Sequence, residues 1–193
     1  STYGIWNAQN PRLKNIVVNI KNLPSQWQNK KIVFVSDIHL GAVNRTPFIK
    51  KIVKQINLVE PELILIGGDY FDGSLSEYNS LTDPLKSIDS KYGVLFINGN
   101  HESYIGERGA DQALQEAGVK ILKDEIANIN GLNIIGADFT SDLGNKQGVA
   151  ELMKRVKPEE ANIFLHHEPR YTELAKAAGI DLQLAGHTHR GQQ

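Results

Sequence analysis

The sequence contains no cysteine among its 193 residues. This absence excludes disulfide-stapled folds, zinc fingers, iron–sulfur sites and a cysteine nucleophile. The six histidines are therefore the only side chains that both titrate near neutral pH and offer a nitrogen ligand to a transition metal. Any metal or acid–base chemistry must be sought where those histidines lie.

The chain also lacks an excess of either charge, because 21 Lys and Arg residues stand against 22 Asp and Glu residues. No overall basic field is available to hold a phosphate backbone, so we expect no nucleic-acid partner. No apolar run approaches the roughly 20 residues of a membrane span. With 40% hydrophobic and 22% charged residues, the composition is that of a soluble globular protein, and we expect one domain over residues 1–193.

Short apolar runs alternate with segments of helical periodicity along most of the chain. The runs predict strands at Ile32–Val35, Leu63–Ile66, Val94–Ile97, Ile134–Ile135, Ile163–Leu165 and Leu182–Ala185. Helical spacing of apolar residues is found at Ile49–Ile56, Leu81–Ile88, Ala110–Ala117 and Val149–Val156. Continuous apolar strands between amphipathic helices predict an α/β or layered α+β domain whose sheet is covered on its faces.

Two segments break the alternation. The β-branched stretch Lys14–Lys21 predicts an edge strand that ends before Pro24. Between Lys120 and Ile135 the pattern changes to short strands around an Asn130-Gly131 turn, which predicts a hairpin. A hairpin within a parallel arrangement indicates a mixed sheet or two sheets.

Five predicted strands each lead directly into a polar cluster, and together the clusters contain all six histidines. They are Asp37-Ile38-His39, Gly67-Gly68-Asp69, Gly99-Asn100-His101-Glu102, His166-His167-Glu168-Pro169 and Gly186-His187-Thr188-His189. Because the carboxyl ends of neighbouring strands meet at one edge, we expect these groups to converge. Imidazole, carboxylate and amide donors together suit Mn, Fe, Zn or Co better than Ca or Mg, and their number predicts two divalent ions.

In this order, the blocks D-x-H, G-D, G-N-H-E, H and G-H-T-H resemble the signature of the calcineurin-like metallophosphoesterase superfamily, from Asp37 to His189. The resemblance implies a four-layer α/β/β/α sandwich with mixed sheets, continued by C-terminal strands that this chain lacks. It implies hydrolysis of a phosphomonoester, phosphodiester or pyrophosphate by attack of a metal-bridging hydroxide. The alternative is a non-catalytic metal-binding scaffold of the same fold.

The resemblance also assigns roles to individual residues. Seven match the family's metal ligands, three for one ion, three for the other and one that bridges them: Asp37, His39 and His189; Asn100, His167 and His187; and Asp69. His101 matches the catalytic histidine that faces the substrate phosphate, and Glu102 is expected to orient it.

His166, Arg190 and the second block are the places where the match to the family needs interpretation. Because strand side chains alternate in direction, only one of His166 and His167 can face the metals, and His166 is expected to lie behind the ligands or on the substrate side. Arg190 is either a phosphate contact or a surface side chain. The second block, Gly68–Gly73, lacks the arginine of the protein phosphatases' G-D-x-x-D-R-G motif, which disfavours a protein-phosphatase function.

The N-terminal stretch Tyr3–Ala8, followed by the predicted edge strand, resembles the approach to the catalytic domain in membrane-anchored bacterial members. This implies a core cut from a longer protein at both ends, membrane-associated through a segment that precedes Ser1, while the fragment itself is soluble. The expected partner is a small phosphorylated substrate, of a lipid-linked or nucleotide-sugar class.

Overall fold

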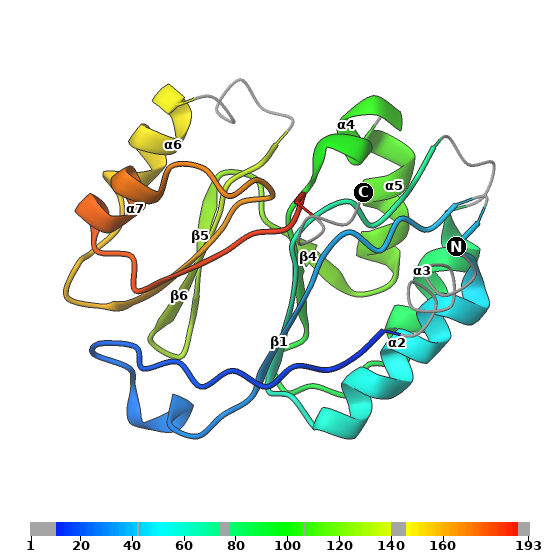
Figure 1. Ribbon diagram of the computed structural model, residues 1–193, viewed down its shortest axis with the longest axis horizontal. Coiled ribbons are helices and arrows are strands. Elements are labelled where there is room, and N and C mark those ends of the chain that lie inside the picture. Colours follow the sequence, from blue (N-terminus) through cyan, green and yellow to red (C-terminus); the bar gives the residue numbers. More distant parts are fainter. Residues whose placement is uncertain (1–10, 42, 74–77, 106, 140–145, 189–193) are drawn as a thin grey trace.

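The computed structural model describes residues 11–188 apart from 42, 74–77, 106 and 140–145. Over these residues the chain forms two four-stranded sheets that lie between two layers of helices (Figure 1). Figure 1 shows α6 and α7 outside one sheet and α2, α3 and α5 outside the other. The predicted four-layer sandwich is therefore confirmed.

The first sheet is wholly parallel, and its strands lie in the order in which they occur in the chain. They are β1 (Ile32–Val35), β2 (Leu63–Ile66), β3 (Val94–Phe96) and β4 (Val119–Ile121). Because they run in the same direction, the carboxyl ends of β1, β2 and β3 lie along one edge of the sheet. Three of the polar clusters begin at that edge.

The second sheet is mixed. Its strands are β5 (Glu125–Ile129), β6 (Leu132–Gly136), β7 (Ala161–Leu165) and β8 (Leu182–Leu184), of which β5 pairs antiparallel with β6 and the others pair in parallel. The predicted hairpin is confirmed, since Asn130 (φ 48°) and Gly131 (φ 83°) form its two-residue turn. Two positive φ values are the signature of the turn type that matches the twist of paired strands.

Helical elements connect the strands, and several of them cover the outer faces. In the described residues they are η1 (Ser25–Trp27), α2 (Thr46–Val59), α3 (Asn79–Thr82), η2 (Asp83–Ser87), α4 (Asn100–Ile105), α5 (Glu107–Glu116), α6 (Lys146–Met153) and α7 (Thr172–Ala178). The apolar stripe of α2, Ile49, Ile52, Val53 and Ile56, is buried as its spacing predicts. None of the helices in the described part of the chain combines the length and apolar character that crossing a bilayer requires.

Side chains along β2 alternate between two hydrophobic cores. Leu63 and Leu65 pack between the two sheets, whereas Ile64 and Ile66 pack against the helices on the outer face. All four side chains are almost completely buried. A strand that is apolar on both faces belongs to a sheet covered on both sides, and this layering holds the strand ends in place at the site.

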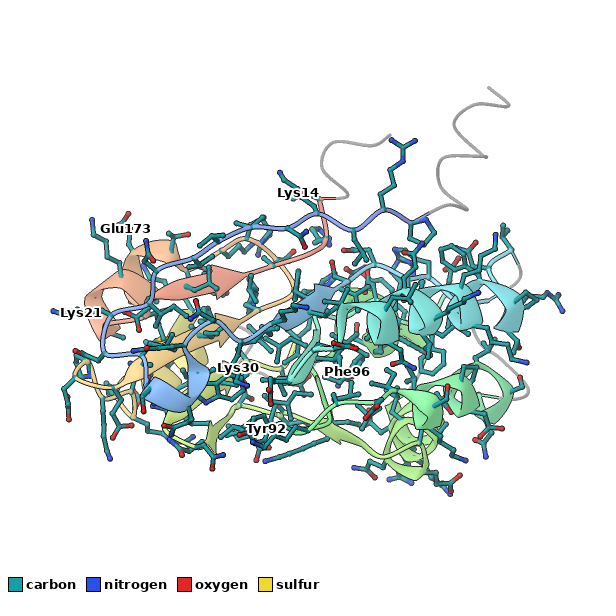
Figure 2. The ribbon with its side chains drawn as sticks, turned by 90° about the horizontal axis from the view of Figure 1, so that it is seen from below. Lys14, Lys21, Lys30, Tyr92, Phe96 and Glu173 are labelled. Atoms are coloured by element: carbon teal, nitrogen blue, oxygen red, sulfur yellow. The ribbon has the colours of Figure 1, made fainter. Side chains whose placement is uncertain are left out.

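The predicted edge strand at Lys14–Lys21 is wrong, because residues 11–20 have no strand or helix. Figure 2 shows the segment, with Lys14 and Lys21 labelled, running along one side of the molecule. Ile16 and Val17 are 68% and 93% exposed. β-branched residues favour an extended backbone, but a strand forms only when a neighbouring strand supplies hydrogen bonds.

Replacing Leu65 with Ala should lower the free energy of unfolding by about 2–5 kcal/mol, because it leaves a cavity between the sheets. Leu58→Ala is the matched control, since Leu58 is 74% exposed and should change the stability by less than about 0.5 kcal/mol. Urea denaturation followed by circular dichroism measures both values. Equal losses in the two variants would contradict the layered core.

Candidate functional site

The segments that follow β1 and β2 stay paired beyond the ends of the two strands. The backbone N–H of Asp37 donates to the carbonyl oxygen of Gly68 at 3.0 Å, and that of His39 donates to the carbonyl oxygen of Asp69, also at 3.0 Å. The ladder of the sheet thus continues into the first two polar clusters. These predicted ligands therefore lie on main chain that hydrogen bonds hold in place.

Four of the predicted ligands lie on left-handed backbone: Asp37 (φ 55°), His39 (φ 48°), Asp69 (φ 51°) and His187 (φ 67°). Side chains with a Cβ are disfavoured in this region, at a cost of roughly 1–3 kcal/mol each, and they persist only where the surroundings hold them. Such positions are concentrated at active sites and ligand clamps. Four of the ten non-glycine residues with positive φ in the described part of the chain are therefore predicted ligands.

Two glycines allow the segments to approach closely. A Cβ on Gly99 would overlap Oδ1 of Asp69, and a Cβ on Gly186 would overlap Oδ2 of Asp37. Each glycine therefore lets one cluster pass against a carboxylate of another cluster.

Glu102 links the backbone of the second cluster to that of the third. Its carboxylate is buried and accepts four backbone hydrogen bonds, at 2.8–3.0 Å, from the N–H groups of Asp69, Tyr70, Phe71 and Gly99. Burial raises the pKa of Glu102, and the N–H groups of Phe71 and Gly99 oppose that rise. Because all four partners are donors, the ionised carboxylate is the form that satisfies them.

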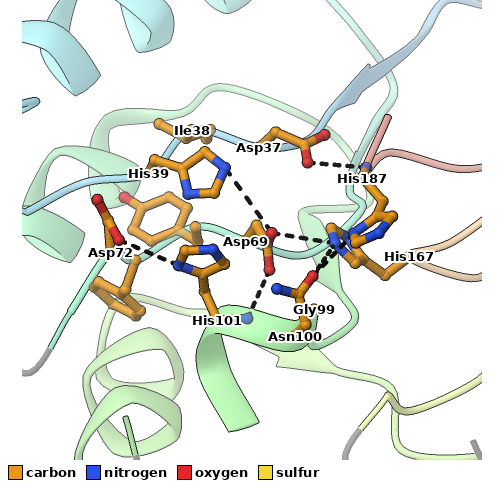
Figure 3. Close-up of polar contacts among 12 residues, drawn as sticks. Asp37, Ile38, His39, Asp69, Asp72, Gly99, Asn100, His101, His167 and His187 are labelled. Carbon is orange, nitrogen blue, oxygen red and sulfur yellow. Dashed lines mark hydrogen bonds and ion pairs between the residues drawn. The ribbon is translucent and has the colours of Figure 1, made fainter. Parts of the chain in front are cut away.

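The carboxylate of Asp69 lies at the centre of the cluster (Figure 3). Its Oδ1 accepts a hydrogen bond from the backbone N–H of His101 at 2.9 Å. Its Oδ2 lies 3.2 Å from Nε2 of His167 and 3.9 Å from Nε2 of His39. Two groups of possible metal-ligand atoms, each within 4.8 Å, share this residue: one with His39 and His101, the other with His167 and His187.

His167, Asn100 and His187 meet on the other side of Asp69. The Oδ1 atom of Asn100 lies 3.0 Å from both Nε2 of His167 and Nδ1 of His187. These three residues lie just after β7, β3 and β8, so both sheets place residues in the cluster. The structure therefore brings together the three residues that the family signature assigns to one ion.

The hydrogen bonds of His167 test whether this set suits a cation. Its Nδ1 lies 2.8 Å from the carbonyl oxygen of Gly67, which can only accept, so Nδ1 carries the proton. In a neutral ring, the lone pair on Nε2 then faces two oxygen acceptors, on Asp69 and Asn100. A lone pair among acceptors is unfavourable unless a proton or a cation lies between them. The donor set therefore fits a divalent metal.

The pKa shifts of Asp69 and His167 follow from their mutual contact. Burial lowers the pKa of His167, but the hydrogen bond and charge of Asp69 outweigh it, and the net shift is upward. Burial raises the pKa of Asp69, but His167 and the N–H of His101 outweigh it, and the net shift is downward. Both shifts favour charged groups, and the site stabilises positive charge beside Asp69.

Asp37 connects the two sheets. Its Oδ1 accepts a hydrogen bond from the backbone N–H of His187 at 2.9 Å, across 150 residues of sequence. Among the described residues it belongs to neither of the two groups built around Asp69. Its ligand role therefore stays a prediction.

His101 has a carboxylate partner that the sequence reasoning missed. Its Nδ1 lies 3.2 Å from Oδ1 of Asp72, and Figure 3 shows this contact on the side of the ring away from His187. Glu102 was expected to orient this ring, yet its hydrogen bonds go to backbone groups. The signal was present in the second block, where Asp72 follows Asp69 by three residues.

The remaining predicted residues fall away from the cluster or outside the described part. His166 is 1% exposed, its Nδ1 lies 2.7 Å from the carbonyl oxygen of Glu168, and its ring packs on Phe164. It thus lies behind His167, on the side away from Asp69. His189 and Arg190 lie outside the described residues.

The sequence of the chain matches a known protein family. The family model described as "Calcineurin-like phosphoesterase" matches residues 30–191. The chain belongs to the calcineurin-like phosphoesterase family. This family carries out metal-dependent phosphoester hydrolysis, and its members use divalent metals.

Relatives of this phosphoesterase chain share 27–31% identity with it. An uncharacterized metallophosphoesterase of Helicobacter pylori is 29% identical and covers 94% of this chain and 50% of its own length. One from Aquifex aeolicus is 30% identical and covers 93% and 70%. A Bos taurus relative named "Transmembrane protein with metallophosphoesterase domain" is 31% identical and covers 100% and 48%. The chain spans about half the length of the first relatives it matches.

Replacing Glu102 with Gln should destabilise this phosphoesterase domain by about 3 kcal/mol, because an amide nitrogen then faces two buried N–H donors. Glu159→Gln is the matched control, because Glu159 is exposed. Thermal and urea denaturation of the two variants would measure the difference. A Glu102→Gln protein as stable as the control would show that the four hydrogen bonds are unimportant to the fold.

Proposed function

We propose that this chain hydrolyses a phosphate ester, or a pyrophosphate, at a centre of two divalent metal ions. The observation that carries the proposal is the position of Asp69, whose Oδ2 lies 3.9 Å from Nε2 of His39 and 3.2 Å from Nε2 of His167. One buried carboxylate between two sets of imidazoles is what a two-metal site requires. The family membership supports the reaction class.

The assignment of ligands to the two ions follows the donor chemistry. We propose that His39 and Asp37, with His189, hold one ion, and that the three residues around Oδ1 of Asn100 hold the other, with Asp69 between them. When bound, such ions supply a nucleophile at neutral pH and neutralise charge on the phosphoryl group. Mn, Fe, Zn and Co are the candidates that suit mixed nitrogen and oxygen donors.

The protein's own part in the reaction is to orient the ring of His101 and to transfer a proton from it. With Nδ1 of His101 facing the carboxylate of Asp72, the ring is held with its Nε2 atom free of that contact. A protonated His101 could then give its Nε2 proton to the leaving oxygen, while the carboxylate of Asp72 stabilises the imidazolium. The ring of His101 is 32% exposed, as a group that meets substrate should be.

For the substrate, we propose a small phosphorylated molecule of a lipid-linked or nucleotide-sugar class. The near-neutral net charge of −1 favours a compact anion over a nucleic acid. Two vertebrate relatives are named as transmembrane proteins with a metallophosphoesterase domain. We propose from this that the whole protein is membrane-associated, through a segment outside the present chain.

Asp69→Asn should lower kcat/KM by at least about 100-fold, because it removes the carboxylate that both ion sites share. Hydrolysis of 4-nitrophenyl phosphate and of its diester with added Mn²⁺ gives the rates, and metal analysis gives the stoichiometry. Asp181→Asn changes a carboxylate outside the cluster and is the control. Near-normal turnover in Asp69→Asn would refute the two-metal proposal, and metal binding without turnover in the native chain would favour a scaffold.

His101→Ala should retain both metals and lower kcat by about 10²–10⁴-fold, because it removes the proposed proton donor. Asp72→Asn should give a smaller loss through the same ring, with metal content again unchanged. Single-turnover rates on substrates with good and poor leaving groups separate the roles, since a good leaving group needs little proton donation. Loss of one metal in His101→Ala would instead make this histidine a ligand.

A further inference from the structure

Glu168, of the fourth cluster, faces His187 of the fifth cluster. Its Oε1 lies 3.6 Å from Nε2 of His187, while Nδ1 of the same ring lies 3.0 Å from Oδ1 of Asn100. The imidazole therefore lies between a carboxylate on one side and the candidate metal centre on the other. The two side chains come from the segments that follow β7 and β8.

The position of Glu168 is held at its backbone. Its carbonyl oxygen lies 2.7 Å from Nδ1 of His166 and accepts a hydrogen bond from the backbone N–H of Arg170 at 2.8 Å. The ring of His166 is itself packed on Phe164 and against Tyr171, at centroid distances of 6.0 and 5.1 Å. A buried histidine thus anchors the segment that carries Glu168.

The two oxygens of the Glu168 carboxylate have different partners, Arg170 and His187. Its Oε2 lies 3.0 Å from Nε of Arg170, which leaves Oε1 toward His187. The Glu168 side chain is 12% exposed and that of His187 is 40% exposed. An ion pair that is open to solvent contributes little to stability. A largely shielded carboxylate with a partner on each oxygen can still orient an imidazole ring.

We propose that Glu168 is a positioning residue, which holds His187 with the proton on Nε2 and the lone pair on Nδ1 toward the metal centre. A carboxylate behind a ligating imidazole fixes its tautomer and orientation and makes it a stronger ligand. This inference rests on the proposed metal-dependent function. It also gives His166 and Arg170 a role, since both contact Glu168.

The first experiment measures metal affinity directly. Titration calorimetry of the metal-free chain with Mn²⁺ should show one binding step weakened by about 10–100-fold in Glu168→Ala. Glu168→Gln should restore part of that affinity, because its amide oxygen can still accept from Nε2. Glu173→Ala, an exposed glutamate on α7, is the matched control and should bind Mn²⁺ as the native chain does.

The second measurement distinguishes positioning from a general structural effect. ¹⁵N NMR of the imidazole in the metal-free protein should show His187 mainly protonated on Nε2 in the native chain, and a mixture of tautomers in Glu168→Ala. The melting temperature of the metal-free variant should stay close to that of Glu173→Ala.

The possible results separate this inference from the proposed function. Native Mn²⁺ affinity in Glu168→Ala would overturn the inference and leave the proposed function intact. Weaker binding that accompanies a large loss of thermal stability, with no rescue by Gln, would also overturn it. If the native chain binds no Mn²⁺, Fe²⁺, Zn²⁺ or Co²⁺ at all, the proposed function fails and this inference fails with it.

Discussion

The candidate site depends on one buried carboxylate, that of Glu102. It lies beneath the segments that follow β2 and β3 and accepts backbone hydrogen bonds from both. Without that carboxylate, four main-chain N–H groups from these two segments would be buried without their side-chain acceptor. The predicted ligands Asp69 and Asn100 thus lie on or next to backbone that the buried carboxylate of Glu102 holds in place. The geometry around Asp69 follows from this support.

Much of this arrangement was predictable because it follows from backbone rules. Continuous apolar strands give parallel pairing, and parallel strands bring their carboxyl ends together, so the convergence of Asp69, Asn100 and His167 follows from the pattern alone. Strand alternation predicted that only one of His166 and His167 could face the metals, and the resemblance to the family selected His167. The structure places His167 beside Asp69. The hairpin turn at Asn130-Gly131 was set by residues that accept positive φ.

What could not be predicted depends on contacts between side chains or on a partner strand. Asp72 and Glu168 are surface-type carboxylates in sequence, and only the folded chain shows that each faces a histidine of the cluster. The role of Glu102 was misjudged for the same reason, since its partners are backbone groups of a distant segment. The stretch Lys14–Lys21 has the composition of a strand, but composition cannot provide the neighbour that a strand needs.

The left-handed backbone at Asp37, His39, Asp69 and His187 sets stability against chemistry in this fold. Glycine accepts that conformation without steric cost, so at each position it would relieve strain while deleting a proposed ligand side chain. Selection or engineering for thermal resistance alone would therefore favour a protein without the proposed activity. At these four positions, side chains persist in a conformation that costs stability, and the proposed chemistry is the reason to keep them.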